Sequence, residues 1–320
     1  MATLAVSTVS LTSPAKINLF LAVTGKRVDG FHDLVSLAVP VEFGDRLSAG
    51  LTASPGLVLE CDDPTLATDE SNLVIRAAKA FRREVSFEGG VRFVLQKRIP
   101  QGAGLGGGSS NAASALQALN RLTGMPLSSA RLSALAAEIG SDCALFLDGG
   151  AVVMRGRGER IEPLEEGARD RLSGRKVWII KPSVGVSTPW AYRMLAAEEP
   201  RLYLSAVEAE QRLVAWVKTP SAPLSALLYN SFEAVVFRKF VALPLLLKRL
   251  ADLFGLQTAM SGSGNACYAF SSDSTEDPGQ TAEIVKVVRE AWGNEAFVVE
   301  TRLRSRALQP EPGDLHRNPR

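Results

Sequence analysis

The N-terminal region alternates between apolar and other residues with a period of two. Over residues 14–23, the apolar side chains at positions 17, 19, 21 and 23 point one way, whereas Lys16, Asn18 and Phe20 point the other. This period predicts a strand with Lys16 and Asn18 side by side on one face. The lysine lies either on the exposed face of a half-buried sheet or beside a polar partner. Asp29-Gly30 then breaks the pattern as a turn.

Similar alternation predicts strands over residues 34–41 and 46–51, separated at Phe43-Gly44-Asp45, and another over residues 91–95. Between the strands at residues 46–51 and 91–95, Ser71-Asn72 precedes an apolar pattern with helical spacing. Serine and asparagine are good N-cap residues, so a capped helix is expected to begin near Leu73.

A glycine-rich run lies between the strand at residues 91–95 and a helical pattern over residues 112–122. Five glycines fall within residues 102–108. The run reads Pro100-Gln101-Gly102-Ala103-Gly104-Leu105-Gly106-Gly107-Gly108-Ser109-Ser110. Glycine lets backbone N–H groups approach a ligand closely, and a helix N-terminus adds positive potential. The run therefore predicts a phosphate site, with Ser109, Ser110 and Asn111 as helix caps that also touch phosphate.

Other classes of glycine loop fit this run less well. Gly102, Gly104 and Gly107 match the G-x-G-x-x-G letters of a dinucleotide fold, which would make the protein an oxidoreductase. That fold also needs an acidic residue about 20 positions on, and residues 124–130 contain none. No G-K-[ST] follows the glycines, so the P-loop signature is absent. A plain linker would not join a periodic strand to a periodic helix.

After the helix at residues 112–122, a second helix is expected from Ser128 to a C-cap at Gly140. Residues 141–147 then indicate a turn into a strand, and residues 148–150 indicate a hairpin turn. Asp142 lies in the first of these turns. From the residues alone it is either a general base that reaches a cleft or an ordinary turn aspartate.

The charged stretch at residues 159–173 lacks apolar periodicity, and we expect a domain boundary there. Beyond it come a strand at residues 176–180 and helical patterns to about residue 254. The turn Ser261-Gly262-Ser263-Gly264 then leads into a strand at residues 266–270, and a helix and a strand end the pattern. Helices and strands do not strictly alternate, so the fold class is α+β. We expect domains over residues 1–165 and 166–305, and a disordered tail over residues 306–320.

Composition limits the class of protein. The 320 residues are 46% hydrophobic and 22% charged with net charge +2, which is typical of a soluble globular protein without a nucleic-acid partner. No apolar run is long enough to span a bilayer, and the N-terminus lacks the features of a signal or transit peptide. Cys61, Cys143 and Cys267 are too far apart for a CxxC pair, and a reducing cytoplasm is expected. With only His32 and His316, a histidine-rich metal site is not expected.

The segment Pro100 to Ser110 resembles the phosphate loop of the GHMP kinases. Residues 14–19 and 261–264 resemble two further motifs of that family, in the same order along the chain. Residues 27–32 and 72–78 are most similar to a branch whose substrate carries a cytidine diphosphate group. The resemblance implies a two-domain GHMP kinase-like fold, with an N-terminal nucleotide-binding domain and a C-terminal α/β sandwich-type domain.

The resemblance also implies an activity. The protein would transfer a phosphate group from ATP, with Mg²⁺, to the 2-hydroxyl of a methylerythritol unit. This reaction belongs to the non-mevalonate route to isoprenoid precursors. The protein would be a monomer or a weak homodimer, and the sequence shows no ligand set for the metal. Kinases of mevalonate or homoserine are the alternative within the family, and residues 29–32 disfavour them. A binding protein without catalysis is disfavoured because Lys16 and Asp142 are both present.

Roles for single residues follow from the resemblance. Lys16 and Asp142 would be catalytic, with the lysine holding the aspartate ionised. Asn72 and Leu73 would border the adenine of ATP, and residues 100–110 would bind its phosphates. Asn18 would contact the substrate.

The cytosine would stack between Phe31 and Tyr192, with His32 at its edge, and Gly262, Ser263 and Gly264 would close over the phosphates. Phe31 replaces the tyrosine usual in this branch, so a hydrogen bond from a phenolic hydroxyl is absent. Without the resemblance, Tyr192 is a core aromatic, His32 a turn histidine and residues 261–264 a plain hairpin turn.

Overall fold

The computed structural model describes residues 8–271 and 279–306. The tail predicted over residues 306–320 lies outside the described residues except for Arg306, and so does His316. Within the described ranges, no helix is long and apolar enough to cross a membrane.

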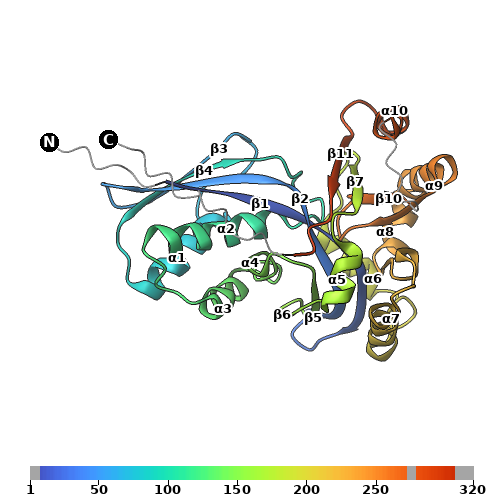
Figure 1. The fold of residues 1–320 in the computed structure, drawn as a ribbon, viewed down its shortest axis with the longest axis horizontal. Helices are drawn as coiled ribbons and strands as arrows, with labels where there is room; N and C mark the ends of the chain where they lie inside the picture. The colour runs from blue at the N-terminus through green and yellow to red at the C-terminus, as the bar shows by residue number, and fades with distance from the viewer. Residues whose placement is uncertain (1–7, 272–278, 307–320) are drawn as a thin grey trace.

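A seven-stranded sheet forms the larger layer (Figure 1). Its main path runs β3-β4-β2-β1-β8, while β5 pairs with β2 and β6 with β5. The strands are β1 (Thr8–Lys26), β2 (His32–Thr52), β3 (Leu57–Cys61), β4 (Gly90–Gln96), β5 (Val152–Gly156), β6 (Arg160–Pro163) and β8 (Tyr229–Asn230). The long antiparallel pair β1–β2 thus carries Lys16 in its middle and Phe31 at its end.

Helices from the first half of the chain cover one face of this sheet (Figure 1). They are α1 (Leu73–Val85), α2 (Gly107–Leu122), α3 (Ser129–Ile139) and the short α4 (Leu145–Asp148). Phe81 of α1 and Leu116 of α2 share a buried cluster with Phe93 of β4. Asn72 caps α1 by accepting a hydrogen bond from the Val74 N–H, which confirms the predicted cap.

The second half of the chain forms a four-stranded antiparallel sheet with the order β11-β7-β10-β9. Its strands are β7 (Lys176–Lys181), β9 (Leu256–Met260), β10 (Cys267–Ser271) and β11 (Phe297–Arg302). The helices are α5 (Glu166–Leu172), α6 (Thr188–Ala196), α7 (Ala206–Lys218), α8 (Glu233–Lys239), α9 (Ala242–Phe254) and α10 (Gln280–Trp292), with a 3₁₀ turn at Leu224–Ala226. The α+β fold class is confirmed.

The largest hydrophobic cluster joins the two halves of the chain. Ile17 and Leu37 of the larger sheet pack in it with Ile179 and Tyr268 of the smaller sheet. The Tyr268 hydroxyl donates a hydrogen bond to the Asn18 carbonyl oxygen at 2.9 Å. Strand β8, from the second half, also pairs with β1. The boundary between residues 165 and 166 stays a prediction.

Two predictions of strands are wrong. The separate strands at residues 34–41 and 46–51 are one strand, β2, because Gly44 lies opposite Pro14 without a side chain. A Cβ at Gly44 would collide with the backbone of Ser13, and a register shift after Pro14 lets pairing continue. The strand expected near residues 145–147 is helix α4, whose Leu145 and Phe146 are buried.

Helix boundaries differ at two further glycine-rich positions. Gly149 ends α4 with a left-handed φ of 73°, so the predicted hairpin turn is a helix C-terminus. Helix α2 begins at Gly107 after the N-cap Gly106, so Ser109 to Asn111 lie within its first five residues and are not caps. Strands β3, β6, β8 and β9 and helix α5 were not predicted. Both β6 and α5 fall within the charged stretch at residues 159–173.

Candidate active site

Two cavities share the glycine loop as a wall. The larger has a volume of about 770 Å³ and the smaller about 550 Å³. Gly104 and Gly106 line both of them. A ligand in one cavity can therefore approach a ligand in the other across these two residues.

The smaller cavity is lined mostly by the glycine loop. The loop residues that line it are Pro100, Gln101, Gly102, Ala103, Gly104, Leu105, Gly106, Gly107, Gly108 and Ser109. Asn72 and Leu73 line it from the start of α1, as does the segment at residues 65–67. Gln101 Nε2 donates hydrogen bonds to Asp63 Oδ2 at 2.9 Å and Thr65 Oγ1 at 3.0 Å, which joins the loop to that segment.

The loop conformation requires glycine at several positions. Gly102, Gly104 and Gly106 have φ values of 63°, 82° and 72°, in the left-handed region. A Cβ at Gly104 would collide with the Ser261 carbonyl oxygen, and one at Gly106 would lie 2.8 Å from Phe146 Cζ. The loop leads directly into the N-terminus of α2, where backbone N–H groups favour an anion.

Ser110 is placed differently from the other loop residues. It is fully buried within α2 and lines neither cavity. Among the described residues its Oγ has no hydrogen-bond partner. Its backbone N–H donates to the Gly106 carbonyl oxygen at 2.9 Å, which is a normal bond of the first helical turn.

A buried ion pair beneath the loop was not predicted from the sequence. Asp45 on β2 pairs with the Lys97 ammonium and accepts from Asn111 Nδ2 at 2.9 Å. Its Oδ1 also accepts from the backbone N–H groups of Arg98 and Ile99 at 2.7 and 2.8 Å. Lys97 and Asn111 both line the smaller cavity. The carboxylate thus fixes the chain just before the loop.

Lys16 and Asp142 meet in the larger cavity, beside Gly104 and Gly106. Lys16 Nζ lies 3.5 Å from Asp142 Oδ2, with the two side chains 6% and 35% exposed. Strand β1 carries the lysine, and the turn between α3 and α4 carries the aspartate. The buried cation therefore has a carboxylate partner that solvent or a ligand can reach.

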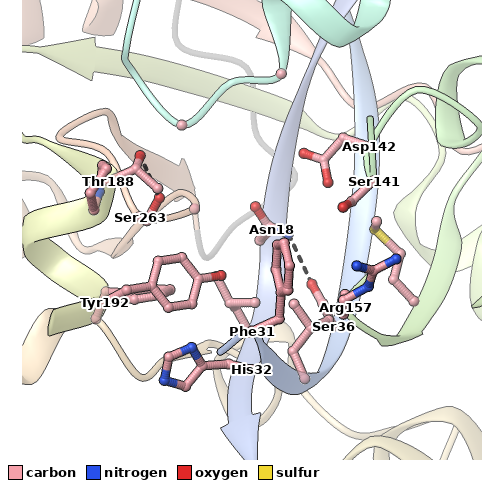
Figure 2. Close-up of a pocket in the computed structure, with 18 of the residues that line it drawn as sticks. Asn18, Phe31, His32, Ser36, Ser141, Asp142, Arg157, Thr188, Tyr192 and Ser263 are labelled. Carbon is pink, nitrogen blue, oxygen red and sulfur yellow. Dashed lines mark hydrogen bonds between the residues drawn. The ribbon is translucent and has the colours of Figure 1, made fainter. Parts of the chain in front are cut away.

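Asn18 is oriented by a chain of hydrogen bonds. Its Nδ2 donates to Ser36 Oγ at 2.9 Å (Figure 2), and that hydroxyl donates to the Phe20 carbonyl oxygen at 2.7 Å. The amide oxygen of Asn18 therefore points to Lys16, whose Nζ donates to it at 2.6 Å. The prediction that Lys16 and Asn18 share a strand face agrees with this contact, although the face is buried.

The second glycine-serine turn packs against the glycine loop. Ser261 Oγ donates to the Gly104 carbonyl oxygen at 3.2 Å, and Ala266 N donates to the Ala103 carbonyl oxygen at 3.1 Å. Gly262 and Ser263 line the larger cavity. Gly264 lines neither cavity, but a Cβ there would collide with the backbone of Ala103.

The other end of the larger cavity is aromatic (Figure 2). The rings of His32 and Tyr192 lie 5.0 Å apart, and the Tyr192 ring packs edge-on to Phe232 at 4.7 Å. Burial lowers the pKa of His32, and the Lys26 charge acts in the same direction. Burial, with the charge of Asp142, raises the pKa of Tyr192 to about 12. Both rings are therefore uncharged at neutral pH.

Three further cations line the larger cavity and were not predicted. They are Lys26, Arg157 and Arg193. Among the described lining residues, Asp142 is the one carboxylate. In the sequence, Arg157 directly follows a strand and has a glycine on each side. This pattern indicates a cation held at a tight turn. Lys26 and Arg193 carry no such signal. The cavity is suited to an anionic ligand with a flat aromatic part.

Comparisons with known proteins agree with this geometry. Residues 72–150 match the GHMP kinases N terminal domain. A 4-diphosphocytidyl-2-C-methyl-D-erythritol kinase of Prochlorococcus marinus is 42% identical over 83% of this chain and 85% of its own. One from Protochlamydia amoebophila is 38% identical over 81% of this chain and 83% of its own. The chain belongs to the GHMP kinases, in the family of the 4-diphosphocytidyl-2-C-methyl-D-erythritol kinases. The family resemblance inferred from the sequence motifs is confirmed.

Solved structures support the same family. The crystal structure of a 4-(cytidine 5'-diphospho)-2C-methyl-D-erythritol kinase is 35% identical, with a TM-score of 0.72 over 92% of this chain and 99% of that one. A mevalonate kinase is 13% identical with a TM-score of 0.70 over 93% of this chain and 99% of that one, which shows a shared fold alone. The two-domain GHMP kinase-like fold is confirmed. The chain is a small-molecule kinase, and its family implies ATP as the phosphate donor.

Proposed function

We propose that this protein transfers the γ-phosphoryl group of ATP to the 2-hydroxyl of 4-diphosphocytidyl-2-C-methyl-D-erythritol. One observation carries the proposal: two cavities meet at Gly104 and Gly106, beside the Lys16–Asp142 pair. A donor in the smaller cavity and an acceptor in the larger would face each other there. The names of the relatives supply the substrate.

The reaction needs positioning and charge neutralisation more than covalent chemistry. The substrate oxygen attacks the γ-phosphorus, the bond from that phosphorus to the β–γ bridging oxygen breaks, and ADP leaves. Asp142 accepts the hydroxyl proton, because its partly exposed carboxylate faces the larger cavity. Lys16, whose Nζ lies 3.5 Å from that carboxylate, offers positive charge to the phosphoryl group during the transfer.

Neighbouring residues hold the lysine of this pair in place. Asn18 accepts a hydrogen bond from Lys16 Nζ, and Ser36 fixes the Asn18 amide. The Lys16 backbone N–H donates to the Leu105 carbonyl oxygen at 3.0 Å, which ties the lysine strand to the glycine loop. The lysine is thus registered against the loop that would hold the ATP phosphates.

The larger cavity also suits the rest of the substrate. Phe31 and Tyr192 offer aromatic faces for the cytosine, and neutral His32 offers a hydrogen bond to its edge. His32 Nε2 is buried without a hydrogen-bond partner among the described residues, as expected of an atom that a ligand satisfies. Lys26 and Arg193 supply positive charge for the diphosphate.

Mg²⁺ is the expected companion of ATP in this reaction, where it neutralises phosphate charge. The described residues contain no cluster of three or more His, Cys, Asp or Glu side chains that could hold a metal ion. Within residues 8–271 and 279–306 the side chains therefore form no metal site of their own, and we derive no step through the ion. A monomer or weak homodimer in the cytoplasm remains our prediction.

The direct test measures ADP release by the purified protein with ATP and each of three acceptors. We expect turnover with 4-diphosphocytidyl-2-C-methyl-D-erythritol and only background release with mevalonate or homoserine. Turnover with mevalonate or homoserine, and none with the cytidine substrate, would contradict the proposal.

A further inference from the structure

An arginine lies against the exposed ring at the cytidine end of the larger cavity. Arg157 Cζ is 4.7 Å from the centroid of the Phe31 ring. Phe31 is 54% exposed and lies at the end of the turn between β1 and β2. In the view of Figure 2, Arg157 lies on one side of the Phe31 ring and Tyr192 on the other. The Arg157 guanidinium thus lies on one side of the Phe31 ring, and the cavity extends from the other side toward Tyr192.

The backbone holds Arg157 in this place. It lies in the tight turn between β5 and β6, flanked by Gly156 and Gly158 with φ values of 67° and 106°. Gly156 pairs with Leu34 of β2, which brings the turn beside the strand that follows Phe31. The Arg157 backbone N–H donates to Glu159 Oε2 at 2.5 Å, which closes the turn. The β5–β6 hairpin therefore fixes the backbone of Arg157 beside Phe31, and the guanidinium lies over the ring.

An exposed aromatic ring on a turn is free to change rotamer, and a stacking ligand must order it. Ordering a side chain on binding costs free energy. A ligand therefore binds more tightly to a ring that is already held in place. A guanidinium over an aromatic face attracts it through the ring quadrupole and stacks flat on it. Arg157 can hold the Phe31 ring in this way without touching a ligand.

We propose that Arg157 is a positioning residue that holds Phe31 ready to stack on the substrate's nucleobase. It acts through the ring and not through the substrate's phosphates. Lys26 and Arg193 line the same cavity and leave the diphosphate with cationic partners. This inference rests on the function proposed above, because it assumes that the nucleobase of the substrate meets Phe31.

Two probes separate action through the ring from action on phosphate: cytidine, which is uncharged, and cytidine 5'-diphosphate. Dissociation constants are measured by calorimetry for the wild type, Arg157→Gln and Arg157→Lys. We expect Arg157→Gln to weaken both ligands by the same factor, about three- to tenfold. Arg157→Lys should recover only part of the loss, since an ammonium does not stack flat. Arg160→Gln, an exposed arginine of the same hairpin outside the cavity lining, is the matched control and should leave both constants unchanged.

A double-mutant cycle with Phe31→Leu tests whether the effect passes through the ring. In the Phe31→Leu background, Arg157→Gln should have no further effect on cytidine binding. In steady-state assays of the wild-type background, Arg157→Gln should raise KM for the cytidine substrate by the same three- to tenfold factor, with kcat and KM for ATP unchanged. A merely structural role for Arg157 would change all three.

Several results would overturn the inference. A loss of cytidine 5'-diphosphate binding with unchanged cytidine binding would assign Arg157 to the phosphates. Unchanged binding of both ligands by Arg157→Gln would contradict the proposed role of Arg157. Failure of the wild type to bind cytidine would contradict it as well. If cytidine binds and depends on Arg157 but the wild type does not phosphorylate the proposed substrate, the proposed function alone is contradicted.

Discussion

The smaller cavity is lined largely by the backbone of one continuous stretch, residues 100–109, whereas the larger is lined by side chains from both halves of the chain. Backbone N–H groups at a helix N-terminus suit a phosphate chain, whose charge is the same in every nucleotide. A nucleobase and a reactive hydroxyl need specific side chains instead. The comparison teaches that donor binding depends on backbone conformation, while acceptor choice and chemistry depend on a few separate side chains.

The second glycine-serine turn, residues 261–264, joins the larger cavity to the glycine loop. It lines the larger cavity through Gly262 and Ser263, and it contacts the glycine loop at Ala103 and Gly104. Asn230 Nδ2 donates to the Gly262 carbonyl oxygen at 2.9 Å, and this hydrogen bond holds the turn in position. A change in this contact should therefore disturb both substrates, whereas changes deep in one cavity should disturb one.

The largest effect is expected at the junction. Asp142→Asn keeps the size of the side chain but cannot accept the proton, so kcat should fall by about 10²–10⁴-fold. KM values for both substrates and the urea midpoint should change little. Rapid-quench measurement of one turnover checks that the chemical step is what slows. A kcat within a few-fold of the wild type would exclude Asp142 as the base.

The next effect separates two glycines of the same loop. Gly104→Ala places a Cβ against the Ser261 carbonyl oxygen, so kcat/KM should fall by about 100-fold for both substrates. Gly102→Ala has the same kind of backbone strain, about 1 kcal/mol, but nothing lies within 4 Å of its Cβ. Steady-state kinetics of both variants should show a much smaller loss for Gly102→Ala. Equal losses would mean that strain, and not the contact with the second turn, governs the loop.

A smaller effect is expected at the aromatic end, where one substrate alone should respond. Tyr192→Leu removes a ring that packs against His32 and Phe232, so KM for the cytidine substrate should rise about tenfold. KM for ATP should not change. Tyr192→Phe keeps the ring and should stay close to the wild type. If Tyr192→Phe is as damaging as Tyr192→Leu, the hydroxyl and not the stacking face is what the substrate uses.

The last prediction concerns stability beneath the second turn. Glu233 accepts a hydrogen bond from the Met260 N–H at 2.8 Å, and burial raises the pKa of Glu233 to about 7. Between the unfolded value near 4.5 and 7, the folded state holds a proton that the unfolded state has released. This group's contribution is therefore full below about pH 4.5 and is lost as pH rises through 7, by about 3 kcal/mol.

Glu233→Gln stays uncharged and should remove this loss, so that the variant is more stable than the wild type at pH 8 but not at pH 5. Urea unfolding at the two pH values measures the difference. Glu283→Gln, an exposed carboxylate on α10, is the control and should leave the pH dependence as it is in the wild type. A wild-type stability that rises from pH 5 to pH 8, with Glu233→Gln showing the same rise, would contradict the assignment.

Sequence patterns predicted the parts of the molecule whose determinants are local. The cap at Asn72, the glycine loop and the strand carrying Lys16 each depend on nearby residues. Strand β2 was split in two because the glycine that interrupts its pattern is matched by Pro14 on another strand. Helix α4 resembles a strand in sequence because both faces of so short an apolar run are buried.

The same distinction holds for the candidate site, where local motifs were predictable and contacts between distant residues were not. Lys16, Asp142 and the loop stood out once three motifs were considered together. The ion pair of Asp45 with Lys97 could not be predicted, because the two residues are distant in sequence and meet only through β2–β4 pairing. Arg157 was missed because its significance comes from Phe31, which lies on a different hairpin.

The central claim is that phosphate crosses from one cavity to the other at Gly104 and Gly106. A crystal structure with a non-hydrolysable ATP analogue and 4-diphosphocytidyl-2-C-methyl-D-erythritol bound together tests it directly. We predict the triphosphate in the smaller cavity along the glycine loop, the cytosine between Phe31 and Tyr192, and the 2-hydroxyl between Asp142 and the γ-phosphate. A nucleotide analogue bound in the larger cavity, or a 2-hydroxyl far from Asp142, would contradict the account.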